Sequence, residues 1–151
     1  MGVKGRQGSL DGTGLRIGIV AARYNQEIVD ALLDGALQTL QEHGAKADPI
    51  LSVPGSFEIP VAAQALADAG DVDAVICLGC VIKGETAHFE QVAEAAAKGI
   101  LDVTLETGVP CVFGVLTTFT EEQARARMDK GKEAAETAIE MANLLKQVRK
   151  G

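Results

Sequence analysis

Aromatic residues are scarce in this chain of 151 residues, which contains no tryptophan, one tyrosine and four phenylalanines. The chain also lacks any apolar run near the roughly 20 residues that a membrane span needs. Its first residues, MGVKGRQGSL, lack the apolar segment of a signal peptide. These absences predict a soluble, cytoplasmic protein with no membrane partner, in which the position of each aromatic side chain is informative.

Positive charge is also in short supply. The chain has 14 Lys and Arg residues against 21 Asp and Glu residues, a net charge of -7, and no dense basic tract. Non-specific binding of nucleic acid depends on such tracts. We therefore expect no nucleic-acid partner, and small molecules or protein partners suit the chain better.

The cysteines are too few and too apolar in context for a disulfide framework. Cys77, Cys80 and Cys111 are odd in number, and each lies within an apolar run, which favours buried free thiols. The Cys77-x-x-Cys80 spacing occurs in redox and zinc motifs, but on an extended strand it directs the two side chains to opposite faces. No second metal-type pair accompanies it, so we expect no metal site.

What the chain does have is a regular alternation of apolar runs and helical patterns. Strands are predicted at 15–22, 47–53, 73–82 and 109–118. Helices are predicted at about 28–40, 57–70, 87–105 and 130–148, with a capping box at Thr120 opening another. Runs that are apolar throughout indicate strands buried on both faces, and the alternation implies right-handed crossovers. The prediction is a single three-layer α/β/α domain over residues 15–151, preceded by a polar arm at 1–14 that is flexible or needs a partner to become ordered.

Unusual residues follow the predicted strands at their carboxyl ends. They are Tyr24-Asn25, Pro54 to Glu58, Lys83 to His88, and Thr117-Thr118. Open α/β sheets bind ligands at that edge. The four loops are therefore predicted to converge on one site.

The stretch Gly84-Glu85-Thr86 precedes a helix, so free backbone amides and the positive end of the helix dipole suit a phosphate there. Simple capping, with Thr86 at the N-cap and Gly84 in the turn, explains the same pattern equally well. His88 favours the ligand-binding interpretation, because a helix N-terminus keeps an imidazole neutral and able to accept a proton. Lys83 raises the alternative of a Schiff-base enzyme, but a lysine beside a glycine turn and Glu85 is expected to stay charged.

Other candidates supply ring walls and charges. Tyr24, Phe57 and Phe113 are predicted at or near the same edge of the sheet and could stack on a heterocycle, although core packing is the usual place of Phe. Ser56 and Glu58 add a hydroxyl and a carboxylate, or cap the following helix. Arg125 or Arg127 could pair with a phosphate, unless both belong to a solvated helix face.

Five segments together resemble the lumazine synthase family, in order from about Leu10 to Leu145. They are ARYNQEI, VPGSFEIP, GCVIKGETAHFEQV, PCVFGVLTTFTEEQA and AIEMANL. The resemblance implies condensation of 5-amino-6-(D-ribitylamino)uracil with 3,4-dihydroxy-2-butanone 4-phosphate to 6,7-dimethyl-8-ribityllumazine, phosphate and water. It implies no metal or organic cofactor.

The resemblance also implies roles for individual residues. Tyr24 stacks on the pyrimidine, His88 shuttles protons, and Arg127 holds the phosphate. Residues expected to bind substrate are Tyr24, Asn25, Ser56, Phe57, Glu58, Val81, Ile82, Lys83, Phe113, Lys130 and Glu133. Gly84, Glu85, Thr86 and Arg127 are expected by the phosphate, with Phe113 and Arg127 coming from an adjacent subunit.

The family fold is a flavodoxin-like sheet of parallel strands whose N-terminal arm adds a strand to a neighbouring subunit. Its members form pentamers with active sites between subunits, and many assemble pentamers into an icosahedral shell. In this chain the segment after Arg127 is shorter than usual. We align Asp129-Lys130-Gly131 with the family's Asn-Lys-Gly, which maps Lys130 and Glu133 near the site. The shortening leaves pentamer, decamer and shell open.

Three alternatives share the same pattern. An archaeal-type riboflavin synthase has the same fold, but the complete GETAHF stretch argues against it. A non-catalytic flavin-binding module would use the same pocket without turnover. A purely structural shell protein would leave the clustered aromatic and phosphate-type residues without a purpose.

Overall fold

The computed structural model describes residues 4–150. In chain order its elements are β1 (Arg16–Ala22), α1 (Gln26–Glu42), β2 (Lys46–Val53), the short 3-10 helix η1 (Ser56–Glu58), α2 (Ile59–Ala69), β3 (Ala74–Ile82), α3 (His88–Thr107), β4 (Cys111–Thr118), α4 (Glu121–Arg125) and α5 (Lys130–Lys150). Every predicted strand and helix is present. At Thr120 the predicted capping box is formed, since the hydroxyl of Thr120 accepts a 3.1 Å hydrogen bond from the backbone N–H of Gln123.

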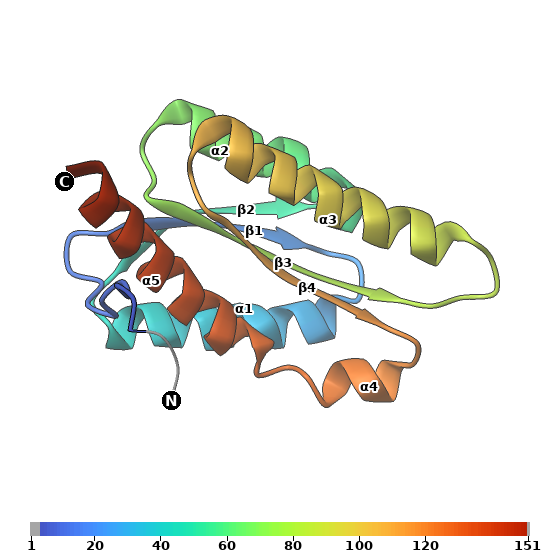
Figure 1. Cartoon of the computed structure of the whole chain (residues 1–151). Helices are drawn as coiled ribbons and strands as arrows, with labels where there is room; N and C mark the ends of the chain where they lie inside the picture. Colours follow the sequence, from blue (N-terminus) through green and yellow to red (C-terminus); the bar gives the residue numbers. More distant parts are fainter. Residues whose placement is uncertain (1–3, 151) are drawn as a thin grey trace.

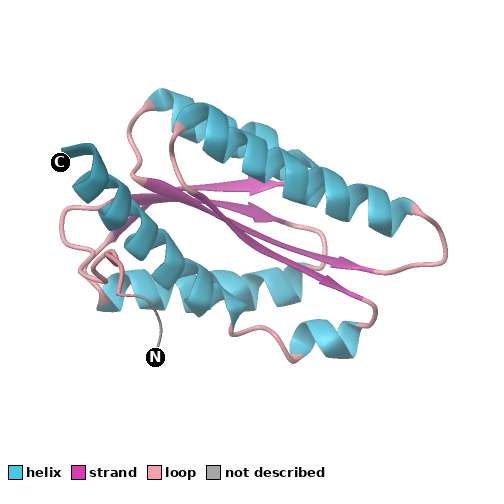
Figure 2. Ribbon diagram, in the orientation of Figure 1, coloured by secondary structure: helices cyan, strands magenta, loops and turns pink. Residues whose placement is uncertain are grey.

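The four strands form one parallel sheet in the order β2-β1-β3-β4. Helices α1, α4 and α5 cover one face and α2 and α3 the other, which gives the predicted three-layer, flavodoxin-like sandwich (Figures 1 and 2). The chain reverses its direction of travel across the sheet between β1 and β3. A crevice opens at such a switch point, beyond the carboxyl ends of the two strands.

The central strands are buried on both faces, as their apolar runs predict. Ile17 and Ile19 of β1 pack towards α1 and α5, whereas Val20 packs towards α2 and α3. Cys77 and Cys80 of β3 lie in these two opposite clusters, which confirms that their spacing separates them. Strand β2 differs because it is an outer strand: none of its residues is fully buried, and Lys46, Ile50 and Ser52 are exposed.

Helices α1 and α5 pack closely because α5 presents small residues. Its buried residues are Gly131, Ala134, Ala135, Ala138, Ile139 and Ala142. A Cβ atom at Gly131 would clash with the carbonyl oxygen of Leu32. This contact fixes the start of α5 and the segment before it, which includes Arg127.

The N-terminal arm contains no strand over residues 4–14. Its last part binds helix α5 of the same chain: the Asn143 side-chain amide donates to the carbonyl oxygens of Ser9 and Asp11 at 2.8 and 2.9 Å. Addition of the arm to a neighbouring sheet stays a prediction, and residues 1–3 of that arm lie outside the described residues. Within residues 4–150, no helix combines the length and apolarity needed to cross a membrane.

Replacing Gly131 with alanine tests the close α1–α5 packing. We expect Gly131→Ala to lower the free energy of unfolding by about 1–3 kcal/mol, because the added methyl group overpacks the contact. Gly35→Ala is the matched control on the facing helix, since its Cβ would lie at an ordinary 3.5 Å from the Lys132 nitrogen. That control should be neutral or stabilising by up to about 1 kcal/mol. Denaturant unfolding at one protein concentration measures both, and equal effects would contradict the packing argument.

Candidate active site

A cavity of about 670 Å³ lies at the carboxyl ends of β1 and β3, at the switch point of the sheet. Its walls come from the loops after β1, β2 and β3 and from the first turn of α3. The lining residues are Tyr24, Pro54, Gly55, Ser56, Phe57, Glu58, Cys80, Val81, Ile82, Gly84, Thr86, His88, Phe89, Gln91 and Val92. Nine of the residues predicted from the sequence are therefore brought together here: Tyr24, Ser56, Phe57, Glu58, Val81, Ile82, Gly84, Thr86 and His88.

The loop after β1 is fixed by hydrogen bonds on both sides of Tyr24. The backbone N–H of Tyr24 donates to the carbonyl oxygen of Pro54 at 3.1 Å. Asn25 adopts a left-handed backbone conformation, with φ of 60°, and its side-chain amide donates to the carbonyl oxygen of Cys80 at 2.8 Å. Asn25 was predicted to bind substrate, but its amide is used to join the loop to β3, and it is not among the lining residues.

The loop after β2 combines capping with exposure of an aromatic ring. Glu58 accepts a 2.9 Å hydrogen bond from the backbone N–H of Gly55. Ser56 is buried, and Gly79 leaves the space for its hydroxyl, because a Cβ there would clash with Ser56 Oγ. Phe57 is 60% exposed and Tyr24 is 75% exposed. Two flat apolar rings therefore stand in solvent at the rim of a cavity instead of packing in the core.

His88 is the first residue of α3, and its side chain is exposed and lines the cavity. Its backbone N–H donates to Thr86 Oγ1 at 3.3 Å, but the N-cap of α3 is Ala87 and no side-chain hydrogen bond caps the helix, so the predicted N-cap role of Thr86 is wrong. Gly84 has open space around it, which leaves the backbone accessible. The arrangement places free amides and an imidazole on the same side of one cavity, which suits both anion binding and proton transfer.

Lys83 and Glu85 are exposed residues of this loop but do not line the cavity. The Lys83 ammonium lies 5.5 Å from the centroid of the Phe119 ring. Lys83 therefore remains on the surface, and nothing around it provides the desolvation that a Schiff-base lysine needs.

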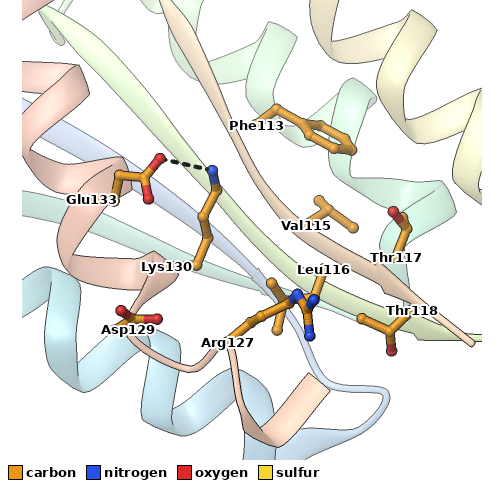
Figure 3. A pocket seen from close by; sticks show the side chains of 9 residues that line it. All are labelled: Phe113, Val115, Leu116, Thr117, Thr118, Arg127, Asp129, Lys130 and Glu133. Atoms are coloured by element: carbon orange, nitrogen blue, oxygen red, sulfur yellow. Dashed lines mark hydrogen bonds and ion pairs between the residues drawn. The ribbon is translucent and has the colours of Figure 1, made fainter. Parts of the chain in front are cut away.

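A second cavity, of about 380 Å³, lies along β4 and the segment that leads into α5 (Figure 3). Its lining residues are Phe113, Val115, Leu116, Thr117, Thr118, Arg127, Asp129, Lys130 and Glu133. Lys130 Nζ and Glu133 Oε1 form an ion pair at 3.0 Å. Phe113 lies in the middle of β4, so it does not join Tyr24 and Phe57 at one edge as the sequence suggested. The predicted residues are instead divided between two cavities.

Arg127 and Arg125 differ in what they bind. Arg125 donates to Glu121 at 2.9 Å and to Glu27 at 3.1 Å, and the hydrogen bond to Glu27, followed by that to Glu121, raises the pKa of the Arg125 guanidinium. Arg127 donates to the backbone carbonyl of Gln123 at 2.9 Å. It forms no ion pair within residues 4–150. Of these two arginines, Arg127 is therefore the one available to an anion.

Several residues that line the cavities were not among the site residues predicted from the sequence. Phe89, Gln91 and Val92 line the first cavity from the helix face that carries His88, and Asp129 lines the second. Gln91 and Val92 lie three and four positions after His88, and this helical spacing was the available signal for those two residues, since such positions share a face. In the described part of the chain, no cluster of His, Cys, Asp and Glu could hold a metal ion.

A flavodoxin-like sheet with exposed rings, a helix N-terminus and a histidine at its switch point defines a class of enzymes that bind a flat heterocycle beside an anion. The sequence model of the 6,7-dimethyl-8-ribityllumazine synthase family matches residues 14–146. The chain is similar to the 6,7-dimethyl-8-ribityllumazine synthase of Salinibacter ruber, with 51% identity over 146 residues that cover 92% of this chain and 94% of that protein. It is also similar to the enzyme of that name from Thermococcus kodakarensis, with 45% identity over 153 residues, 99% of this chain and 98% of that protein. The chain belongs to the 6,7-dimethyl-8-ribityllumazine synthase family.

The three thiols should be inert in the folded protein. Burial raises the pKa of Cys80 to about 11, and it also raises the pKa values of Cys77 and Cys111. Because the thiolate is the reactive form, a raised pKa lowers reactivity at pH 8. We expect iodoacetamide to label the folded protein at least about tenfold more slowly than free cysteine. All three thiols should react at the free rate in guanidinium chloride, and fast labelling without denaturant would contradict their burial.

Proposed function

We propose that the two cavities are complementary halves of one active site, which is completed where one copy of the chain contacts another. Lumazine synthases condense 5-amino-6-(D-ribitylamino)uracil with 3,4-dihydroxy-2-butanone 4-phosphate, and this transferase reaction of riboflavin biosynthesis is the function of the chain. The reaction needs a proton carrier and a cation for the departing phosphate. The proposal is supported by the positions of the proton carrier and the cation, which line different cavities of the chain.

Neither cavity holds both groups. The cavity beside α3 contains His88 but no lysine or arginine. The cavity along β4 contains Arg127 and Lys130 but no histidine. Joining the first cavity of one subunit to the second cavity of the next supplies both. A head-to-tail contact of this kind generates a closed ring when the rotation between subunits closes.

In the completed site, each group has a task. Tyr24 and Phe57 hold the pyrimidine between apolar surfaces, and the partner's Phe113 closes the stack. Arg127 and the amides near Gly84 hold the phosphate of the ketone. The amine of the pyrimidine attacks the ketone carbonyl, so the protein supplies no nucleophile; it orients two substrates and moves protons.

His88 accepts and returns protons as the imine forms, water leaves and phosphate is eliminated. Its exposure within the cavity supports this role, because protons must exchange with substrate and solvent. Ser56 and Glu58 contact the ribityl chain, and Lys130 and Glu133 border the phosphate end; their positions in the linings of the two cavities support these roles.

We propose a cytoplasmic homo-oligomer whose ring is a pentamer. The outer strand β2 leaves an unpaired edge, and Ile50 on that strand is 45% exposed. An N-terminal arm of a neighbouring subunit could add a strand there and cover that edge. The short connection between α4 and α5 does not favour a shell over a free pentamer.

Mixing the purified protein with both substrates tests the reaction. Formation of fluorescent 6,7-dimethyl-8-ribityllumazine together with release of phosphate is expected. A riboflavin synthase would instead consume the lumazine without releasing phosphate, and a flavin-binding module would bind it without turnover.

Removing the imidazole should separate catalysis from binding. We expect His88→Ala to lower kcat by roughly 10²-fold, the lower end of what proton transfer by a positioned side chain contributes. The dissociation constant of the product lumazine, measured by fluorescence titration, should stay within about twofold of the original protein. Unchanged turnover would remove the proton-transfer role.

The two arginines provide a matched pair. Arg127→Ala should raise the KM for the phosphorylated ketone by about 10- to 100-fold, because a charged hydrogen bond to phosphate is lost. Arg125→Ala removes a guanidinium that is already bound to two carboxylates and should change that KM little. Equal effects of the two substitutions would contradict the assigned role of Arg127.

Complementation between variants tests whether the site is shared. Co-expression of His88→Ala and Arg127→Ala chains should yield mixed oligomers with more activity than either variant alone. In these oligomers some sites combine an intact His88 with an intact Arg127 from different subunits. If both residues served a site within one subunit, mixing would restore nothing.

A further inference from the structure

The loop from Lys83 to His88 is poorly supported along its length, although it carries the residues proposed to bind phosphate and move protons. Every residue from 83 to 88 is exposed, and a side chain at Gly84 would meet no atom within 4 Å. Its backbone contacts the rest of the domain through a 2.9 Å hydrogen bond from the Lys83 N–H to the carbonyl oxygen of Thr118. A loop of this kind would lose conformational entropy when it closes around an anion.

A single side chain, Phe119, contacts both ends of this loop. At one end the Lys83 ammonium lies 5.5 Å from the centroid of the Phe119 ring, a cation–π geometry. At the other end the ring of Phe89, the residue after His88, lies 6.2 Å from Phe119 between centroids, with a tilt of 44°. Phe119 therefore spans the loop from its first residue to the first turn of α3.

Phe119 is itself held by a rigid turn between β4 and α4. Its backbone N–H donates to the side-chain oxygen of Gln123 at 2.9 Å. The same oxygen accepts from the N–H of Thr120 at 3.3 Å, and the hydroxyl of Thr118 donates to the carbonyl oxygen of Thr120 at 2.8 Å. The ring is 65% exposed, so it contributes little to the core and is explained better by its contacts with the loop.

We propose that Phe119 is a positioning residue that clasps the Lys83–His88 loop, so that the amides near Gly84 and the imidazole of His88 are preoriented before the phosphorylated substrate binds. The inference rests on the proposed function, because its effect on turnover acts through that loop. The pyrimidine walls Tyr24 and Phe57 belong to other loops, so binding of the pyrimidine does not depend on the clasp.

Two measurements on the intact oligomer test the clasp. The first is hydrogen–deuterium exchange of peptides covering residues 83–92, and the second is the KM for each substrate. Phe119→Ala should speed exchange in that segment and raise the KM for the phosphorylated ketone, each by about threefold to tenfold, which corresponds to one aromatic pair. The KM for the pyrimidine should stay within about twofold.

Conservative variants separate the ring from general packing. Phe119→Tyr keeps the ring and should restore both values to those of the original protein. Lys83→Met keeps the aliphatic stem but removes the charge, and it should give a smaller effect in the same direction. Val148→Ala is the control. It shortens an exposed apolar side chain on α5, in a different part of the chain from Phe119, and should change neither measurement. Should Phe119→Ala fail to fold, Phe119→Leu loses the ring while keeping apolar bulk and serves the same comparison.

The outcomes distinguish the clasp from the proposed function. A protein that makes no lumazine while Phe119→Ala still speeds exchange would refute the function and leave the clasp standing. An active protein in which Phe119→Ala leaves loop exchange unchanged would overturn the clasp. Faster exchange without a change in the KM for the ketone would also overturn it. Phe119 would then order the loop, but that order would not help the protein to bind the ketone.

Discussion

Burial of β1 and β3 on both faces is the constraint on which the rest of the structure depends. A strand covered by helices on both sides has to be apolar along its length, and parallel neighbours joined by helical crossovers all end at the same edge. Polar and charged side chains that could act on a ligand consequently lie in the loops beyond these two strands. Because the sheet reverses its winding between β1 and β3, those loops leave a crevice there.

The rigidity of this edge comes from a few specific hydrogen bonds. The Asn25 amide joins the loop after β1 to the carbonyl oxygen of Cys80, and the Tyr24 N–H joins the same loop to Pro54. Neither contact uses a group that faces substrate, so the walls are positioned before any ligand arrives. The loop after β3 lacks such bonds over most of its length and depends on contacts with the turn after β4. The cavity thus combines two firmly held walls with one lightly held loop, Lys83–His88.

The division of functional residues between two cavities has a simple physical origin. Phe113 and Arg127 belong to β4 and to the segment before α5, and the close contact of Gly131 with Leu32 holds that segment against α1. This places them along the outer strand, apart from the crevice between β1 and β3. Under the proposed function, which needs a cation beside the proton carrier, one chain by itself does not form the whole site. Association with a second copy is the direct way to complete it.

The order and type of the helices and strands followed from the sequence, because unbroken apolar runs fit only strands buried on both faces and the helical spacing between them was regular. The sequence also indicated the loops that carry Tyr24, Phe57 and His88, since strand ends in such a sheet are where ligands bind. Residue patterns alone could not decide that the Asn25 amide would bind Cys80, that Phe113 would line a different cavity from Tyr24, or that Arg125 would form ion pairs with two carboxylates; only the family resemblance separated Phe113 and Arg127 from the other site residues. Those outcomes depend on distances between residues far apart in the chain, which only the packed sheet and helices set.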